Sequence, residues 1–301
     1  DLAFRVILFA IFIQIIYVTF QKEVNPSQFV SLLEKKRNFY GTYFLALDKR
    51  NYQKELCHGN TRHGYQFINP ETKQLIYEPT SYYTEQSGIA LVETLIRQEK
   101  PIINAGIIGL GAGVFAYYGQ KGDNFDFFEI DPKVIDVANR EFSFLAGSKA
   151  NIKVILGDGR LNIIKEPDKK YDIVVMDAFN SDAVPVHLLT IEAIEQYLNK
   201  LNNSGVLVVN ISNRFLNLKN LLDSICNRLK LVSVSILTNT TPEDKAMLAN
   251  EYYVIAKDKA FIDKLMQAKK PYREITLRQV SDKNKFWTDD YSNLFTVLRF
   301  N

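Results

Sequence analysis

Two aspartates near the end of a hydrophobic segment are the residues of this chain best suited to carry chemistry. Asp177 directly follows a short apolar run at residues 173–176, and Asp182 lies in the segment that follows. Such an unbroken run is typical of a parallel strand covered on both faces, and ligands bind at the carboxyl ends of these strands. A buried carboxylate is costly unless it meets a cation, a hydrogen-bond donor or a substrate. The pair therefore predicts a functional site at this strand end.

A glycine-rich loop marks a second strand end. Gly109, Gly111 and Gly113 follow one expected strand and precede an expected helix. Glycines at such a turn let the backbone approach a ligand where a side chain would obstruct it. Glu129 ends the next expected strand, about 20 residues further on, which is the offset at which an acid binds ribose hydroxyls in dinucleotide sites. The combination predicts a nucleotide-like ligand.

A third strand end carries an acid between two glycines. Asp158 and Gly159 follow the expected strand at residues 152–156, where a carboxylate can accept a hydrogen bond from an adenine amino group. An ordinary Asp-Gly turn is the alternative for this segment taken alone. Three consecutive strand ends that carry the glycine loop, Glu129 and Asp158 favour the adenosyl-binding series of the methyltransferase fold over a nicotinamide enzyme.

The elements that must position these residues alternate between strand and helix after residue 100. Strands are expected at residues 102–110, 125–130, 152–156, 171–176, 206–211, 231–237 and 252–256. Helices are expected at residues 133–144, 190–201 and 217–229. This alternation predicts a doubly wound α/β sheet with helices on both faces. Upstream, short aromatic or branched segments separated by polar turns predict a small antiparallel sheet.

The composition is that of a folded chain with balanced charge. Its 301 residues, 47% hydrophobic and 24% charged, suffice for one large domain with a small appendage. The net charge of +3 is too balanced to predict a nucleic-acid partner. Cys57 and Cys226 lie far apart without a C-x-x-C spacing, so neither a disulfide framework nor a zinc site is suggested, and no metal is expected.

The first segment is typical of a membrane helix. Residues 6–20 are apolar except for Gln14 and Thr19, and the run approaches the length of about 20 residues that spans a bilayer. Arg5 lies near the helix end, where it can snorkel to the interface. A secretory signal is the alternative, but no small-x-small cleavage site follows Phe20.

The flanks of this segment set its expected location. The chain begins at Asp1 without a methionine, so residues 1–22 are expected to be the last helix of a longer membrane region. Three basic residues follow at residues 35–37. The positive-inside tendency then predicts an inner (plasma) membrane protein with its catalytic domain in the cytoplasm.

Several motifs together resemble the spermidine synthase-like (polyamine aminopropyltransferase) family, most closely its membrane-fused bacterial branch. The resemblance covers the chain from about Phe39 to Phe300 and rests on residues 38–41, 58–66, 78–83, 109–113, 177–187 and 287–293. It implies a Rossmann-like, seven-stranded methyltransferase-type sheet preceded by a small β-domain, with a site between them for decarboxylated S-adenosylmethionine and a diamine. The expected divisions are a transmembrane helix at 1–22, the β-domain at 38–80, the adenosyl-binding domain at 81–260 and a C-terminal segment at 261–301 that packs on it.

The resemblance also implies roles for individual residues. Asp177 and Asp182 match the two acids of the family's D-S-S-D loop, although their spacing is wider here. An alkylammonium is neutral in only about one molecule in 10³ at pH 7, so a carboxylate that takes its proton meets a chemical need. We expect Asp182 to accept the proton and Asp177 to anchor the reacting nitrogen. Gln66, Tyr82 and Tyr83 match positions that line the substrate pocket in relatives.

Ala112 is a departure that bears on the cofactor. Soluble aminopropyltransferases carry an acid at this place in the glycine loop, where it meets the amine of the aminopropyl tail. A methyltransferase that uses intact S-adenosylmethionine therefore stays an alternative, although it leaves the pairing of Asp177 and Asp182 unexplained. A non-catalytic domain that senses an adenosyl ligand or a polyamine on a membrane protein is the third reading, and the retained acids argue against it. The expected partners are a small-molecule amine and the membrane, and a homodimer is one option.

Overall fold

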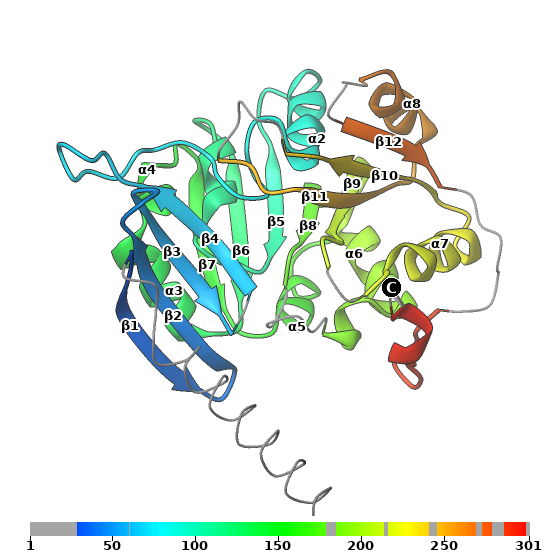
Figure 1. Ribbon diagram of the computed structural model, residues 1–301. Coiled ribbons are helices and arrows are strands. Elements are labelled where there is room, and N and C mark those ends of the chain that lie inside the picture. The colour runs from blue at the N-terminus through cyan, green and yellow to red at the C-terminus, as the bar shows by residue number, and fades with distance from the viewer. Residues whose placement is uncertain are drawn as a thin grey trace, which may run out of the picture.

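The computed structural model describes residues 29–59, 61–178, 185–213, 216–240, 246–268, 273–278 and 286–298. Within these ranges the strands form two sheets, which Figure 1 shows in blue and in green to orange. One is a four-stranded antiparallel sheet of order β1-β2-β3-β4, and the other is an eight-stranded mixed sheet of order β12-β10-β11-β9-β8-β5-β6-β7. The predicted α/β class with a small antiparallel sheet ahead of a Rossmann-like sheet is confirmed.

The small sheet consists of two connected hairpins. Its strands are β1 (Val30–Asn38), β2 (Gly41–Asp48), β3 (Gln53–His58) and β4 (Thr61–Phe67). In β2, buried Tyr43 and Leu45 alternate with more exposed Phe44, which is the pattern of a sheet with one covered face. The sheet begins at Val30, ahead of the expected domain boundary at residue 38.

Polar contacts hold the small sheet against helix α3 (Pro132–Glu141). Nδ2 of Asn38 donates to both carboxylate oxygens of Asp131, at 2.7 and 2.8 Å. Nζ of Lys54 lies 2.9 Å from Oε2 of Glu141. The two ends of α3 are thus tied to β1 and β3, which fixes the small sheet over the carboxyl end of the large one.

The order and direction of the strands in the large sheet determine where a ligand can bind. Its strands are β5 (Asn104–Ile108), β6 (Asn124–Glu129), β7 (Asn151–Leu156), β8 (Tyr171–Met176), β9 (Leu201–Asn210), β10 (Val232–Thr238), β11 (Asn250–Ala256) and β12 (Arg273–Leu277). Strands β7, β6, β5, β8 and β9 are parallel, whereas β11, β10 and β12 continue the sheet by antiparallel pairing. The chain runs outward from β5 first toward β7 and then toward β9, so the switch point lies between β5 and β8.

Helices cover the large sheet and connect its strands. They are α2 (Gly88–Arg97), α3, α4 (Phe144–Gly147), α5 (Gly159–Ile163), α6 (Ile191–Lys200), α7 (Lys219–Arg228) and α8 (Lys259–Gln267), with 3₁₀ turns η1 (Val114–Tyr118), η2 (Val186–Leu188) and η3 (Leu294–Val297). Two apolar clusters fill the space on either face of the sheet. The residues Ile173 to Met176 of β8 are completely buried between them, as the unbroken apolar run predicted.

The predicted number of seven strands is wrong, because the described sheet has eight. Strand β12 pairs antiparallel with β10 and lies in the segment expected only to pack on the domain. It is a short edge strand whose residues alternate between buried and exposed, as in buried Ile275 beside exposed Glu274. Such a strand carries little continuous apolar signal, which is why the sequence pattern did not reveal it.

The predicted membrane location is also contradicted. Across the ranges that the structure describes, no helix has the length and apolar character needed to cross a membrane. The longest of these helices have ten residues and measure about 15 Å, against about 30 Å of bilayer hydrocarbon. The segment expected to span the membrane, residues 1–22, lies outside the described residues.

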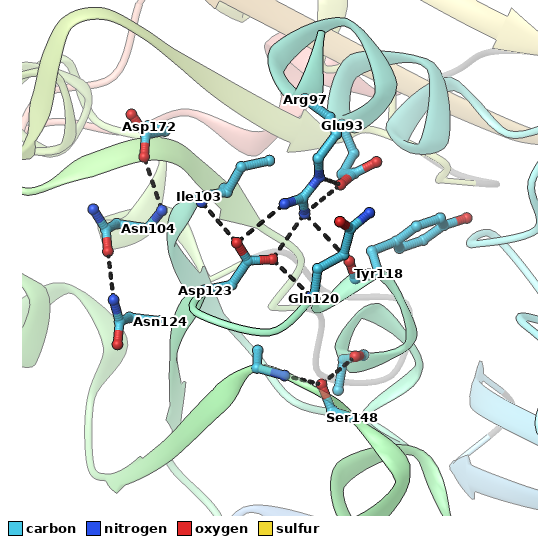
Figure 2. Close-up of polar contacts among 12 residues, drawn as sticks. Glu93, Arg97, Ile103, Asn104, Tyr118, Gln120, Asp123, Asn124, Ser148 and Asp172 are labelled. Atoms are coloured by element: carbon cyan, nitrogen blue, oxygen red, sulfur yellow. Dashed lines mark hydrogen bonds and ion pairs between the residues drawn. The ribbon is translucent and has the colours of Figure 1, made fainter. Parts of the chain in front are cut away.

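A buried ion-pair network fixes the amino-terminal edge of the large sheet (Figure 2). The guanidinium of Arg97 donates to both oxygens of Asp123 at 3.0 and 2.8 Å, and to Oε1 of Glu93. Asp123 is fully buried and also accepts the backbone N–H groups of Ile103 and Gln120, each at 2.8 Å. Because Ile103 precedes β5 and Asp123 precedes β6, one carboxylate aligns two central strands with helix α2.

We expect Asp123→Asn to lower the free energy of unfolding by about 3–5 kcal/mol. The amide removes the fully buried one of the two carboxylates that pair with the partly buried guanidinium of Arg97, and removal of one partner of a buried pair carries a cost of about this size. Urea unfolding measures the difference. The control is Asp136→Asn, which removes an exposed i,i+4 partner of Arg140 and should change stability by no more than about 0.5 kcal/mol. Equal effects of the two variants would contradict the assignment.

Candidate active site

A pocket opens at the carboxyl ends of the parallel strands, beneath the small sheet. It encloses about 810 Å³, counted out to its open mouth. Its floor comes from the loop after β5, the ends of β6 and β8, and the start of α5, and its roof includes His58 and His63 of the small sheet. The pocket therefore lies at the topological switch point, where ligands bind in doubly wound sheets.

The glycine loop makes this arrangement sterically possible. Gly109 has a φ of +100°, and a Cβ there would lie 2.3 Å from the backbone oxygen of Asp177. Gly111 has a φ of +54°, and a Cβ there would lie 2.4 Å from the backbone oxygen of His63. These two glycines line the pocket, as expected of cofactor-binding residues. Gly113 instead packs on Leu145, outside the pocket lining.

Glu129 lies at the end of β6 and is oriented by the backbone around it. Its Oε2 accepts the N–H of Leu110 and its Oε1 accepts the N–H of Asp131, both at 2.9 Å. Burial raises the pKa of Glu129 against the lowering effect of these bonds. Since each carboxylate oxygen has two lone pairs, the side chain keeps acceptor capacity on its pocket side. This is the place expected for an acid that binds ribose.

Asp158 has partners that sequence reasoning did not anticipate. It caps α5 by accepting the N–H of Leu161 at 2.8 Å, and its Oδ2 lies 2.9 Å from Nε2 of His187. Gly159 lines the same corner, where a Cβ would come within 2.5 Å of Cγ2 of Ile108. The carboxylate of Asp158, which we predicted to contact adenine, thus also contacts a half-exposed histidine and caps a helix.

Asp177 is held from two sides at the end of β8. Its Oδ2 accepts the hydroxyl hydrogen of Tyr83, and its Oδ1 accepts from Nδ2 of Asn210 at 2.8 Å. Burial raises the pKa of Asp177, while both hydrogen bonds oppose that shift. Asn210 was missed by sequence reasoning, although its position at the end of a strand next to β8 was the available signal. Tyr83 reaches Asp177 without lining the pocket itself.

Two residues expected in the substrate pocket lie elsewhere. Gln66 is fully buried, and its amide bonds the backbone oxygen of Ile76 and both the hydroxyl and the N–H of Ser143. This side chain joins β4 to the loop before α4 and is not part of the pocket lining. Tyr82 lines a separate, shallower hollow together with Asn213 and Glu251. Asp182 lies outside the described residues.

The pocket is strongly acidic. Four carboxylates line it: Glu129, Asp131, Asp158 and Asp177. Among the described residues that line it, none is a lysine or an arginine. Carboxylates concentrated in a cleft with low-dielectric walls attract cations. The fold and this site define a Rossmann-like α/β protein suited to a positively charged ligand.

The chain belongs to the spermine/spermidine synthase family. The family model described as the spermine/spermidine synthase domain matches residues 114–264. Among curated relatives, a polyamine aminopropyltransferase of Vibrio vulnificus is 39% identical over 111 residues, which is 35% of this chain and 36% of that protein. The eEF1A lysine and N-terminal methyltransferase of Xenopus laevis is 30% identical over 117 residues, 35% of this chain and 17% of that protein. The aligned segments therefore cover only a part of these relatives.

Solved structures support the fold over a longer stretch. A probable spermidine synthase from Corynebacterium glutamicum aligns with a TM-score of 0.58 and 13% identity, covering 84% of this chain and 92% of that one. The spermidine synthase of Thermotoga maritima aligns with a TM-score of 0.52 and 13% identity, covering 80% and 79%. At this identity the likeness concerns the fold alone. The membrane-fused branch of the family stays a prediction from the motifs.

Proposed function

We propose that this protein transfers an aminopropyl group from decarboxylated S-adenosylmethionine to a di- or polyamine. The acidic pocket carries the proposal, because both substrates are cations. The decarboxylated donor has a sulfonium and an ammonium group, whereas the intact cofactor adds a carboxylate. Four lining carboxylates, with no lysine or arginine among the described lining residues, favour the ligand with the higher positive charge. Family membership supports the same class of reaction.

The strand order supports a definite order of the ligand's parts. Neighbouring strands in the sheet run β8, β5, β6 and β7. Their ends carry, in that order, Asp177, the glycine loop, Glu129 and Asp158. We assign adenine to Asp158, ribose to Glu129, the sulfonium to the glycine loop and the acceptor amine to Asp177. Adenine, ribose and the amine then each meet a carboxylate that can accept a hydrogen bond, and the sulfonium meets the backbone of the glycine loop, in the order in which the groups are linked.

The reaction is a displacement at carbon. The lone pair of a neutral amine attacks the propyl carbon next to the sulfonium, and a carbon–nitrogen bond forms. The carbon–sulfur bond breaks, its electron pair stays on sulfur, and methylthioadenosine leaves as a neutral thioether. Before the attack, the ammonium form of this nitrogen loses one proton to a carboxylate, which leaves the lone pair free. We assign this proton to Asp182 and the anchoring of the nitrogen to Asp177, whose position Tyr83 and Asn210 support.

A methyltransferase that uses intact S-adenosylmethionine is the second candidate. The match to the Xenopus methyltransferase favours it, and so does the loss of an acid at Ala112. Such an enzyme would need a partner for the cofactor's carboxylate. Since no described lining residue is a lysine or an arginine, aminopropyl transfer remains the better supported function. A measurement of product distinguishes a domain that binds these ligands without catalysis from both enzymes.

Calorimetry with decarboxylated S-adenosylmethionine, S-adenosylmethionine and methylthioadenosine tests the proposal. We expect the decarboxylated donor to bind at least about tenfold more tightly than the intact cofactor, because the described pocket lining offers the carboxylate of the latter four acids and no lysine or arginine. Product formation with a di- or polyamine then establishes turnover. Tighter binding of the intact cofactor would favour methylation, binding without product would favour a sensor, and absence of binding to all three would refute both enzyme readings.

A further inference from the structure

His63 lies on β4 directly above the glycine loop. Its backbone oxygen accepts the N–H of Ala112 at 3.1 Å, and the residue lines the pocket. The same oxygen lies where a Cβ of Gly111 would be. This close contact between strand and loop fixes the imidazole over the part of the pocket that we assign to the sulfonium and its tail.

The imidazole of His63 has an unused nitrogen. Its Nε2 is buried, and within the part of the chain that the structure describes no group forms a hydrogen bond with it. Burial, with a smaller effect from His58, lowers the pKa of His63 to about 4. The ring is therefore neutral at pH 7 and has one N–H donor and one lone pair. A buried polar atom without a partner is unfavourable, which points to a ligand that completes the bond.

The surroundings of His63 favour a cationic donor. The ring centroids of His58 and His63 are 5.6 Å apart, and Asp131 acts electrostatically on His58 from the same wall. Asp131 is buried and held by Asn38. A neutral acceptor in a pocket lined by four described carboxylates and by no described lysine or arginine suits an ammonium group far better than a carboxylate.

Ala112 explains why the hydrogen-bond acceptor is His63 on β4 and not an acidic side chain in the glycine loop. Its side chain is 1% exposed and packs under β4, where a Cβ at Gly64 would lie 2.8 Å from Cβ of Ala112. A carboxylate at this loop position would be buried against the backbone of β4. The small sheet thus occupies the space of an acidic side chain and presents His63 to the pocket.

We propose that Nε2 of His63 accepts a hydrogen bond from the terminal ammonium of the aminopropyl donor, in place of an acid at Ala112. The inference rests on the proposed function and deepens it, because it names the residue that binds the ammonium of the donor's tail. His63 is thereby a donor-binding residue that methylthioadenosine, which lacks the tail, does not use.

Binding of two ligands to His63→Leu tests the inference. Decarboxylated S-adenosylmethionine carries the ammonium, and methylthioadenosine lacks it. We expect the variant to bind the donor about tenfold to a hundredfold more weakly, which is the effect of losing one hydrogen bond to a charged group, and to bind methylthioadenosine within about twofold of wild type. His63→Gln keeps an acceptor oxygen and should recover most of the donor affinity.

His187→Leu is the matched control, because it removes a pocket histidine at the corner of Asp158. It should change the affinity for both ligands by the same factor. Equal weakening of both ligands by His63→Leu, or no change in either, would overturn the inference while wild-type preference for the donor kept the proposed function intact. Failure of the wild-type protein to bind either ligand would overturn the proposed function and the inference with it.

Discussion

Asp177→Asn is expected to reduce the rate of aminopropyl transfer by about 10³-fold or more while leaving the affinity for methylthioadenosine within about threefold. The amide has no charge with which to hold the attacking nitrogen as positive charge develops on it. Its NH₂ group would also face Nδ2 of Asn210 or the hydroxyl of Tyr83, both of which now donate to the carboxylate. Preorganised electrostatic contacts of this kind contribute about 10²–10³-fold, and displacement of the nucleophile adds to the loss.

Initial rates at saturating donor and varied amine measure this effect. Tyr83→Phe is the graded control, because it removes one hydrogen bond to Asp177 and keeps the carboxylate. We expect it to lower the rate by only about tenfold. An Asp177→Asn enzyme that transfers as fast as Tyr83→Phe would show that the charge of Asp177 is not used in the reaction.

The alternation of strands and helices was predictable because the central parallel strands are buried on both faces. The apolar run before Asp177 became β8. Elements outside this alternation were harder to predict from the sequence. Strand β12 is half exposed, and the turn η1 after the glycine loop is a 3₁₀ helix where a regular helix was expected. The domain divisions at residues 80 and 260 stay proposals.

The part of the candidate site that lies at the carboxyl ends of the parallel strands was predictable. The carboxyl ends of parallel strands share one edge, so the glycine loop, Glu129, Asp158 and Asp177 had to meet there. The packing of the small sheet on that edge does not follow from the direction of the strands. The contact of His63 with the loop depends on non-local packing that no local pattern encodes.

The same limit explains the substrate residues. Gln66, Tyr82 and Tyr83 were placed in the pocket by resemblance, and of the described pocket acids Asp177 accepts a hydrogen bond from Tyr83, whereas Gln66 and Tyr82 do not line the pocket. Gln66 lies on β4 with its amide turned toward Ser143, where it links the small sheet to the large domain. A match in sequence identifies a position in the fold, whereas the direction of a side chain depends on the partners that surround it.

Asp182→Asn is expected to abolish product formation at pH 7, with at least about a 10³-fold loss in rate, and to leave the affinity for the adenosyl ligand within a few-fold. The reason is the protonation state of the acceptor amine, of which only about one molecule in 10³ is neutral at this pH. Without a proton acceptor, the enzyme depends on that fraction. Asp168→Asn, at an exposed acid that pairs with Lys200, is the control and should transfer normally.

The pH dependence separates a proton acceptor from an anchor. The neutral fraction of the amine rises about tenfold for each pH unit below its pKa of about 10.4, so the rate of Asp182→Asn should rise about a hundredfold between pH 7 and pH 9. Asp177→Asn should gain no more than wild type over this range, because a neutral amine still lacks its anchor. At high pH the neutral amine is abundant and compensates for the loss of the proton acceptor, but not for the loss of the anchor. Equal pH profiles for the two variants would therefore show that Asp182 does not take the proton.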